Sequence, residues 1–256
     1  MKTGPLDEVA GFAPLDPQLV LGAYSVGVFP MADSRNADSV YWVEPNERAI
    51  LPLEGFHLSH SLRKTLVSDR FHVTADAAFE QVIALCAETA EDRSDTWINR
   101  QIERASIELH RLGFAHSIEV WDGDRLAGGL YGIALGRAFF GESMVSRARD
   151  ASKIAMAWLV ARLKVGRFTL LDCQFMTPHL ASLGAVEIPR QTYVGLLSVA
   201  VDGVVGAGAS AAGAAAAGDF FALDRGAPSW PALSPAGIES GPADGKVIAQ
   251  LLVHTS

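Results

Sequence analysis

Three apolar runs joined by two tight turns constrain the fold of this chain more than any other feature. The runs are His116–Trp121, Leu126–Leu135 and Ala138–Val145, and the turns between them are Asp122-Gly123-Asp124 and Gly136-Arg137. Short runs of this kind, separated by glycine-containing turns, are typical of strands that pair with their chain neighbours. The sequence therefore predicts an antiparallel meander, whose apolar faces other elements must cover.

The segments around the meander alternate between helical and extended patterns. Residues 76–90 and the stretch after Asn99 carry apolar residues at helical spacing, and Gly113 is a plausible stop for the second helix. After the meander we expect a helix, a strand, a short helix, a strand and a helix, at Ser152–Val165, Phe168–Phe175, Pro178–Leu183, Val186–Ile188 and Thr192–Val199. This order is that of the acetyltransferase-like (GNAT-like) fold, an α+β fold with a mixed sheet flanked by helices. Its fourth and fifth strands splay apart and leave a cleft, although a fold alone does not give a function.

Three regions follow from composition along the chain. Residues 1–56 are predicted to form a small N-terminal α+β lobe, with a helix near Leu19–Tyr24 and strands at Val40–Val43 and Ala49–Leu51. Residues 57–205 are predicted to form the GNAT-like domain. Residues 206–256 are rich in Ala, Gly and Pro, and 207–217 contain only Ala, Gly and Ser, which predicts a linker or mobile tail.

Charge and cysteine content exclude several classes of function. The net charge is -8, which disfavours a broad surface for duplex DNA, because neutralising many phosphates requires a basic face. Cys86 and Cys173 are expected to be free thiols. His57 and His60 lack a third ligand, so we expect no metal site. The absence of a long apolar run and of a signal-like N-terminus predicts a cytoplasmic protein with no membrane association.

Two polar residues interrupt the apolar strand after the meander. Strand side chains alternate between faces, so Asp172 and Gln174 share one face and Cys173 points to the other. Buried polar groups need partners or a ligand. A structural hydrogen-bonded pair and a ligand site are equally good explanations, whereas Cys173 fits a packed thiol better than a nucleophile.

A carboxylate interrupts the last meander strand in a similar way. Glu142 is expected to share a face with Met144, next to the strand that carries Asp172. It could hold a cationic substrate group, although a glutamate that faces solvent is the commoner case. The Gly-x-Ser at Ser143 lacks the second glycine of a nucleophile elbow, so we interpret this serine as structural.

A basic stretch follows, and two tryptophans lie elsewhere among polar residues. The basic residues are Arg147, Arg149, Lys153, Arg162, Lys164 and Arg167, against the single acid Asp150. They could meet phosphates, although a solvated helix face is the more common explanation. Trp42 and Trp97 could stack on a nucleobase, although packing is the commoner role of any single tryptophan. An acyl-CoA acetyltransferase would need a glycine-rich loop at residues 145–152, which contain no glycine.

Taken together, these segments resemble the leucyl/phenylalanyl-tRNA–protein transferase family over roughly residues 17–200. The resemblance rests on GVFPM, YWVEPNERAIL, TWI, HSIEVWDGDRLAGGLYG, FFGESMVSR, ASK, LLDCQ and HLASLGAVEIPR. It implies the transfer of Leu or Phe, and less well Met, from the 3′ end of aminoacyl-tRNA to a protein with N-terminal Arg or Lys. The product would be a degradation signal of the bacterial N-end rule pathway. A monomer without a cofactor is expected.

The resemblance also implies roles for individual residues. Asp172 and Gln174 match the reaction centre, Glu142 matches an acid that helps to hold the acceptor, and Trp42 and Trp97 match tryptophans that contact the terminal adenosine of tRNA. The pocket for the donor side chain would be lined by Leu130, Phe139, Met144, Met156, Leu159, Leu163 and Leu171.

These roles lead to a chemical hypothesis. The Gln174 carbonyl, oriented by Asp172, would accept a hydrogen bond from the attacking amine, while Glu142 and Asp172 supply negative charge for the acceptor's cationic side chain. Arg147, Arg149 and Lys153 would contact a few tRNA phosphates. An acyl-CoA N-acetyltransferase, a peptidoglycan-type tRNA-dependent aminoacyltransferase and a non-catalytic binding module remain as alternatives.

Overall fold

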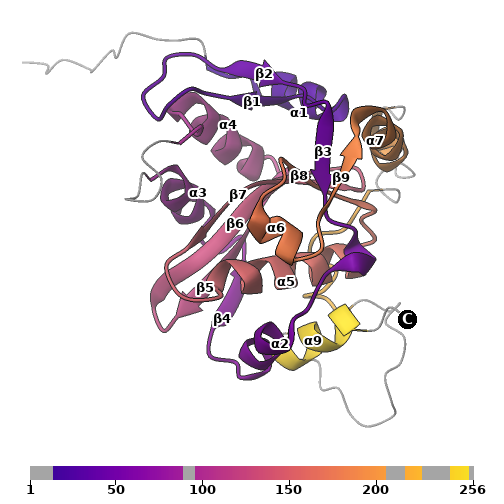
Figure 1. Ribbon diagram of the computed structural model, residues 1–256. Helices are drawn as coiled ribbons and strands as arrows, with labels where there is room; N and C mark the ends of the chain where they lie inside the picture. Colours follow the sequence, from indigo (N-terminus) through magenta and orange to yellow (C-terminus); the bar gives the residue numbers. More distant parts are fainter. Residues whose placement is uncertain (1–13, 89–95, 206–216, 227–242, 254–256) are drawn as a thin grey trace, which may run out of the picture.

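A single mixed sheet organises the computed structural model, which describes residues 14–88, 96–205, 217–226 and 243–253 (Figure 1). Its seven strands follow the order β4-β5-β6-β7-β8-β3-β9. They are β3 (Glu47–Ile50), β4 (His72–Ala75), β5 (Ala115–Asp122), β6 (Arg125–Leu135), β7 (Ala138–Ser146), β8 (Leu170–Gln174) and β9 (Val186–Pro189). β5, β6 and β7 pair antiparallel in sequence order, which confirms the predicted meander.

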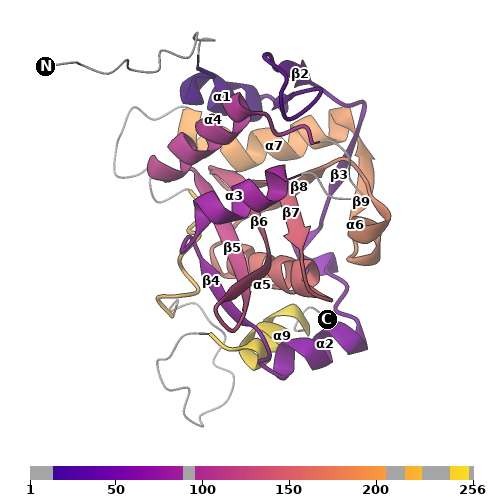
Figure 2. The same ribbon diagram turned by 90° about the vertical axis from the view of Figure 1, so that its left-hand side faces the viewer.

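Helices cover both faces of this sheet and divide the core into two clusters. The first cluster lies between the sheet and α5 (Ala151–Val165), with α2 (His60–Val67), α9 (Gly245–Val253) and η1 (Leu53–Gly55) outside it. The second lies on the opposite face, beneath α3 (Phe79–Ala87), α4 (Arg100–Arg111), α1 (Pro17–Ser25) and α7 (Arg190–Val205). Figure 2 shows α3 and α5 on either side of the strands. A short helix, α6 (Pro178–Ser182), precedes β9.

Local sequence signals explain several helix ends. The Asn99 side chain accepts a hydrogen bond from the Ile102 backbone N–H at 3.0 Å, so this residue caps α4, the helix predicted to follow it. Gly113 follows the helix with a φ of 81°, a left-handed conformation that glycine adopts without strain. The helices predicted at 76–90 and 152–165 correspond to α3 and α5, although residues 89–90 lie outside the described part of the chain.

The only parallel pair among the described strands is β7 with β8. Its register covers three residue pairs and ends at Phe140 opposite Asp172, while β7 runs on to Ser146. The two strands therefore stop pairing just before Glu142 and Gln174, which places both side chains at the point where the strands part. A mixed sheet flanked by helices is what the sequence predicts, and the more specific relation to the GNAT-like fold stays a prediction.

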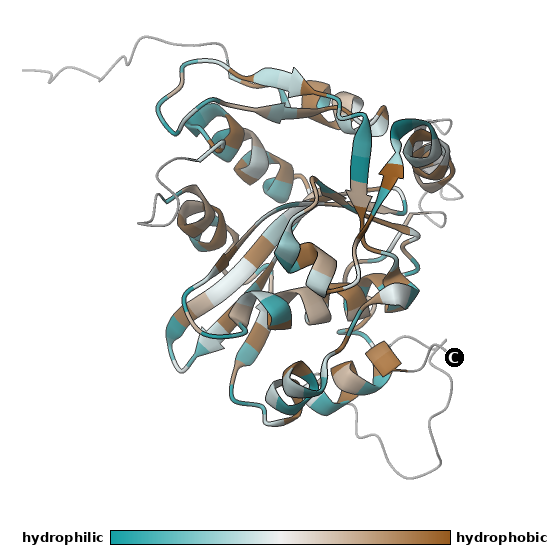
Figure 3. Ribbon diagram, viewed as in Figure 1, coloured by the Kyte–Doolittle hydropathy of each residue, from teal (hydrophilic) through white to brown (hydrophobic). Residues whose placement is uncertain are grey.

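The N-terminal segment divides its strands between two sheets. β1 (Phe29–Met31) pairs with β2 (Tyr41–Val43) and, with α1, forms a small layer beside the main sheet. β3 does not pair with β2 but enters the main sheet between β8 and β9. The lobe predicted for residues 1–56 thus gives its last strand to the main sheet, and Figure 3 shows that this strand begins with hydrophilic residues.

The C-terminal region contributes to the core, which differs from the linker or mobile tail that composition predicts. Phe220 and Leu223 are 4% and 5% exposed, and α9 packs against α2 and α5. The Ala/Gly/Ser composition of residues 207–216, which lie outside the described residues, obscured the apolar residues that follow. The helix α2 and the strand β4 were also not predicted from the sequence. Within the described ranges, no helix combines the length and the apolar character needed to cross a bilayer.

Candidate active site

Glu142, Asp172 and Gln174 lie together at the end of the β7–β8 pair. The Gln174 Nε2 donates a hydrogen bond to Glu142 Oε1 at 2.8 Å, and the Tyr24 hydroxyl donates to the same oxygen at 2.7 Å. Asp172 Oδ1 accepts a hydrogen bond from the Gln174 backbone N–H at 2.8 Å. The three residues that sequence reasoning placed at a reaction centre are therefore connected by direct hydrogen bonds.

Asp172 is fully buried and its charge is neutralised within the protein. Arg48 Nε contacts both carboxylate oxygens at 2.9 and 3.1 Å, and Arg48 Nη2 contacts Oδ2 at 2.5 Å. The Tyr193 hydroxyl donates to Oδ2 at 2.8 Å. With five hydrogen bonds from four donor groups directed at two oxygens, the Asp172 carboxylate has no capacity to hold an acceptor's cationic side chain, which differs from the role that the sequence suggested.

The Arg48 side chain joins several parts of the fold. It is 1% exposed, and its guanidinium lies 4.6 Å from the Phe29 ring centroid and 4.5 Å from that of Tyr193. Its Nη1 donates to the Gly27 carbonyl at 3.0 Å. Two aromatic faces and a bidentate carboxylate satisfy the charge away from water. Arg48 thereby ties the loop after α1, β3, β8 and α7 together.

Gln174 has an unusual backbone conformation. Its φ is 62°, in the left-handed region that costs non-glycine residues energy unless neighbours hold it. The hydrogen bond from its N–H to Asp172 supplies such a restraint. Its side-chain amide nitrogen is engaged by Glu142, which leaves the amide oxygen as the group that can accept a hydrogen bond from a substrate amine.

A β-bulge places Glu142 differently from its prediction. Tyr131 pairs with Ser143 and Gly132 pairs with Gly141, so Glu142 is an extra residue on β7. The bulge reverses the alternation of faces: Met144 packs in the α5-side cluster, whereas Glu142 bonds to Tyr24 of the opposite cluster. The expectation that Glu142 and Met144 share a face is therefore wrong, because period-2 alternation does not continue across a bulge.

The environment of Glu142 favours its neutral form. Burial, as the largest cause, and the nearby Asp172 charge together raise the pKa of its carboxyl to about 8, against the lowering effect of the Tyr24 hydrogen bond. A second cation brought close to this carboxyl would lower the pKa again. Glu142 is thus a group whose charge responds to what binds beside it.

The residues expected to line a donor pocket lie in one cluster on the α5 side of the sheet. They are Leu130, Phe139, Met144, Met156, Leu159, Leu163 and Leu171. All are buried except Met144, which is partly exposed. Leu171 and Asp172 are adjacent and point to opposite faces, so this cluster and the polar group meet at the edge where β7 and β8 separate. Cys173 packs on the same side as Leu171, and burial raises the pKa of its thiol, as expected of a packed residue.

Both predicted tryptophans lie at the small N-terminal layer. Trp42 is 39% exposed and pairs with Pro30 across the β1–β2 sheet. The Trp97 carbonyl accepts a hydrogen bond from the Ala32 backbone N–H at 3.1 Å, which places the second tryptophan beside the same sheet. The structure thus brings the two residues to one region.

Fewer side chains of the basic stretch are available to bind phosphates than the sequence suggests. Arg162 is buried and its guanidinium contacts Asp224 at 2.6 Å, and Lys164 contacts Glu54 at 2.8 Å. Arg147 pairs with Glu88 at the surface. Arg149 is exposed, and Lys153 lies in the first turn of α5. Arg147, Arg149 and Lys153 remain as cations near the turn between β7 and α5.

That turn uses its own backbone donors. The Arg147 and Ala148 N–H groups bond to the Ala127 carbonyl at 2.7 and 3.1 Å, and the Ser152 N–H bonds to Ser146 Oγ at 3.3 Å. An acyl-CoA pyrophosphate requires such donors to be free at the start of a helix. The turn therefore disfavours the acetyl-CoA alternative for a reason beyond its lack of glycine.

Sequence reasoning missed Tyr24, Arg48 and Tyr193. Arg48 had a usable signal, since an arginine directly before the apolar run Ala49-Ile50-Leu51 requires a buried partner. The tyrosines had none, because nothing in their local sequence indicates which distant carboxylate they contact. Neither cysteine is part of a disulfide. Among the described residues, no group of three or more His, Cys, Asp or Glu side chains is placed to hold a metal ion.

Comparison with known proteins shows which family the chain resembles. Residues 50–198 match the family model described as leucyl/phenylalanyl-tRNA protein transferase, and residues 13–46 match the model of its N-terminal domain. The chain is 60% identical over 249 residues to a protein of Rhizorhabdus wittichii named leucyl/phenylalanyl-tRNA–protein transferase, which covers 94% of this chain and 99% of the relative. Proteins of the same name from Zymomonas mobilis and Novosphingobium aromaticivorans are 64% and 51% identical, over 73% and 94% of this chain and over 70% and 97% of the relatives.

Proposed function

This chain belongs to the leucyl/phenylalanyl-tRNA–protein transferase family of aminoacyltransferases, and we propose that it joins Leu, Phe or less readily Met from aminoacyl-tRNA to proteins with N-terminal Arg or Lys. The product would carry a new N-terminal residue that marks it for N-end rule degradation in the cytoplasm. The observation that supports this proposal best is the hydrogen-bonded group of Glu142, Gln174 and Asp172 at the separation of β7 and β8.

In the proposed reaction, the acceptor's α-amine attacks the carbonyl carbon of the aminoacyl ester. A C–N bond forms, the C–O bond to the tRNA ribose breaks, and the amine's proton ends on the departing ribose oxygen. The donor is an activated ester, and a free α-amine has a pKa of about 7.7–8.0, so much of it is already neutral near pH 7. Alignment rather than a strong base then supplies most of the rate.

Gln174 aligns the amine in this proposal. Its amide oxygen accepts a hydrogen bond from the attacking nitrogen, while its amide nitrogen is fixed by Glu142 at 2.8 Å and its backbone by Asp172. Asp172 acts as a positioning residue, since Arg48 and Tyr193 already occupy its carboxylate. The restraint of both ends of Gln174 keeps the amide oxygen in one direction.

Glu142 receives the cationic side chain of the acceptor. Without an acceptor its carboxyl is largely protonated near pH 7, because burial raises its pKa to about 8. An arginine or lysine side chain beside it favours the ionised form, so acceptor binding and proton release are coupled at this residue. Neutral N-terminal residues cannot drive this ionisation, which gives the site a preference for Arg and Lys.

The donor side chain enters the cluster on the α5 side, past the partly exposed Met144. Residues unbranched at Cβ fit against Met144 and Leu130, which lie side by side in the β6–β7 register. Val and Ile are crowded there, and one methyl group is worth about 1–3 kcal/mol in such a pocket. Trp42 and Trp97 contact the terminal adenosine, and Arg147, Arg149 and Lys153 contact a few phosphates near the 3′ end.

Transfer of labelled Leu from charged tRNA to a peptide with N-terminal Arg tests this proposal. The wild-type chain should transfer Leu, and Gln174→Ala should lower kcat while its free energy of unfolding stays near that of the wild type. Gln191→Ala, at an exposed position of α7, is the matched control and should retain wild-type turnover. Near-full turnover by Gln174→Ala would remove Gln174 from the mechanism, and no transfer by the wild-type chain would end the proposal.

A further inference from the structure

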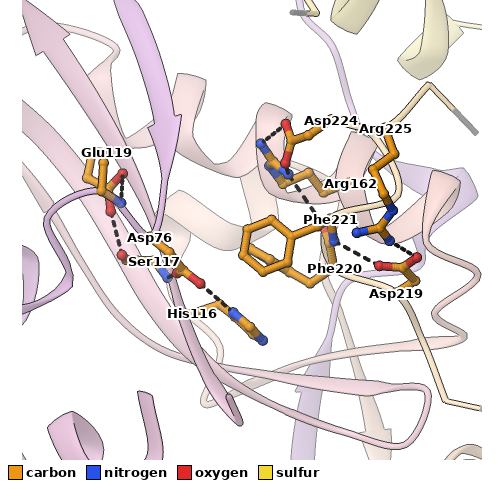
Figure 4. A network of polar contacts seen from close by, with 11 residues as sticks. Asp76, His116, Ser117, Glu119, Arg162, Asp219, Phe220, Phe221, Asp224 and Arg225 are labelled. Carbon is orange, nitrogen blue, oxygen red and sulfur yellow. Dashed lines mark hydrogen bonds and ion pairs between the residues drawn. The ribbon is translucent and has the colours of Figure 1, made fainter. Parts of the chain in front are cut away.

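A segment near the C-terminus is built into the wall of the donor-side cluster. We name residues 218–225 the clasp, because both of its ends are held by the main domain. The Gly218 N–H bonds to the Gly136 carbonyl at 2.8 Å, and the Asp219 N–H bonds to the Gly166 carbonyl at 2.9 Å. At the other end, Arg162 of α5 contacts both oxygens of Asp224 at 2.6 and 2.7 Å (Figure 4).

The clasp packs closely against the main domain at two glycines. A side chain at Gly166 would collide with the Asp219 carbonyl oxygen, and one at Gly218 would collide with the Phe168 ring. Arg162 also donates to the Phe220 carbonyl at 3.3 Å, and its guanidinium lies 5.4 Å from the Phe220 ring centroid. The backbone of the clasp is thus fixed on both sides of Phe220.

Phe220 lies near the middle of the clasp, and its ring stacks with two other rings. Its centroid lies 4.2 Å from that of His116, with 13° between the planes, and 5.8 Å from that of Phe139, with 11° between the planes. His116 is itself held by Asp76 at 2.7 Å (Figure 4). The Phe220 ring therefore has a fixed support behind it.

Phe139 is one of the residues that line the proposed donor pocket, and its ring has little freedom to move. Phe220 stacks on one face of it, and Phe168 approaches edge-on with centroids 6.4 Å apart and 77° between the planes. A donor side chain that presses on Phe139 meets Phe220, His116 and Asp76 in series. The depth of the pocket at this wall is then set by the size of residue 220.

From this contact series we infer that Phe220 is a specificity-determining residue that fixes how large a donor side chain the enzyme accepts. The inference rests on the proposed function, since it requires the cluster around Phe139 to receive the donor side chain. A smaller residue at position 220 lets Phe139 retreat and favours Phe over Leu. A larger residue pushes Phe139 inward and favours Leu over Phe.

The experiment compares two substitutions of opposite size in the full chain. The ratio of kcat/KM for phenylalanyl-tRNA to that for leucyl-tRNA is measured with one peptide acceptor that carries N-terminal Arg. Phe220→Leu should raise this ratio and Phe220→Trp should lower it, each by about tenfold, the lower end of what one methylene is worth in an apolar pocket. The KM for the acceptor peptide should stay at its wild-type value in both variants.

Phe221→Leu is the matched control. Phe221 lies on the same segment and meets His116 and Phe220 edge-on, at 82° and 87° between the planes, rather than stacking toward the pocket. Its donor ratio should equal that of the wild type. A merely structural role of the clasp would lower transfer from both donors together and would leave the ratio unchanged in every variant.

Three results would overturn the inference. They are a donor ratio unchanged in both Phe220→Leu and Phe220→Trp, a shift of the ratio in the same direction in these two variants, and an equal shift in Phe221→Leu. If Phe220→Trp does not fold, Phe220→Met takes its place as a second smaller residue, and it must raise the ratio as Phe220→Leu does. Failure of the proposed function looks different, because the wild-type chain would then transfer neither amino acid.

Discussion

Replacing Arg48 with methionine should destabilise the fold and inactivate the enzyme through a single atom group, the Asp172 carboxylate. Both members of the pair are buried, at 1% and 0% side-chain exposure, and Arg48 makes three of the five hydrogen bonds to the Asp172 carboxylate. Methionine keeps apolar contact with Phe29 and Tyr193 but leaves the carboxylate without a counter-charge. Breaking a buried pair on one side costs about 3–5 kcal/mol, so we expect Arg48→Met to lower the free energy of unfolding by this amount.

The double variant Arg48→Met/Asp172→Leu separates stability from chemistry. Replacing both members of a buried pair with apolar residues of similar size is often neutral or stabilising by about 1–4 kcal/mol, so the double variant should regain most of the lost stability in urea titrations. Its transfer activity should stay low, because no carboxylate then holds the Gln174 N–H. A single variant within about 1 kcal/mol of the wild type, or a double variant with wild-type turnover, would refute the reasoning.

Four further outcomes test the site. In wild-type enzyme the KM for an N-terminal Arg peptide should fall as pH rises toward about 8, where Glu142 ionises without an acceptor, and Glu142→Gln should lose this dependence, as steady-state kinetics across pH can measure. The same raised pKa stabilises the fold below its ordinary value of 4.5 and that stability is lost as pH rises toward about 8; denaturation of Glu142→Gln should lack this slope, and a slope equal to that of the wild type would contradict the shift. Isoleucyl-tRNA should be a poor donor beside leucyl-tRNA, and equal kcat/KM for the two would show that the pocket tolerates branching at Cβ. Binding of charged tRNA should depend weakly on salt, because we propose that Arg147, Arg149 and Lys153 contact only a few phosphates, and a slope that corresponds to six or more contacts would require a further basic surface.

Local patterns in the sequence predicted the features that depend on local physics. The meander, the helix after Asn99 and the shared face of Asp172 and Gln174 follow from turn residues, apolar periodicity and strand alternation. Each needs only a few neighbouring residues, so tertiary contacts had little opportunity to override it. The specific acceptor, donor and tRNA roles came from resemblance to a family and remain predictions for this chain.

Features that depend on distant partners could not be read in this way. The β-bulge at Glu142 arises from the register between β6 and β7, and the sequence around residue 142 alone does not indicate an extra residue. The neutralisation of Asp172 requires Arg48, which lies 124 residues away in sequence. The clasp was hidden by composition, since Phe220 and Leu223 follow a stretch that is typical of a linker.

The reaction centre and the docking of the N-terminal layer depend on the same buried pair. Arg48 bonds to the Gly27 carbonyl on one side and to Asp172 on the other, and Asp172 bonds to the Gln174 N–H. Movement of the layer that carries Trp42 therefore strains the same contacts that fix the Gln174 backbone at a φ of 62°. If the tryptophans hold the end of the tRNA, the distance between the bound ester and the Gln174 amide is set by contacts with 1% or less exposure to water. Such contacts resist solvent competition, which makes Arg48 better suited than an exposed charge to maintain an alignment on which the rate depends.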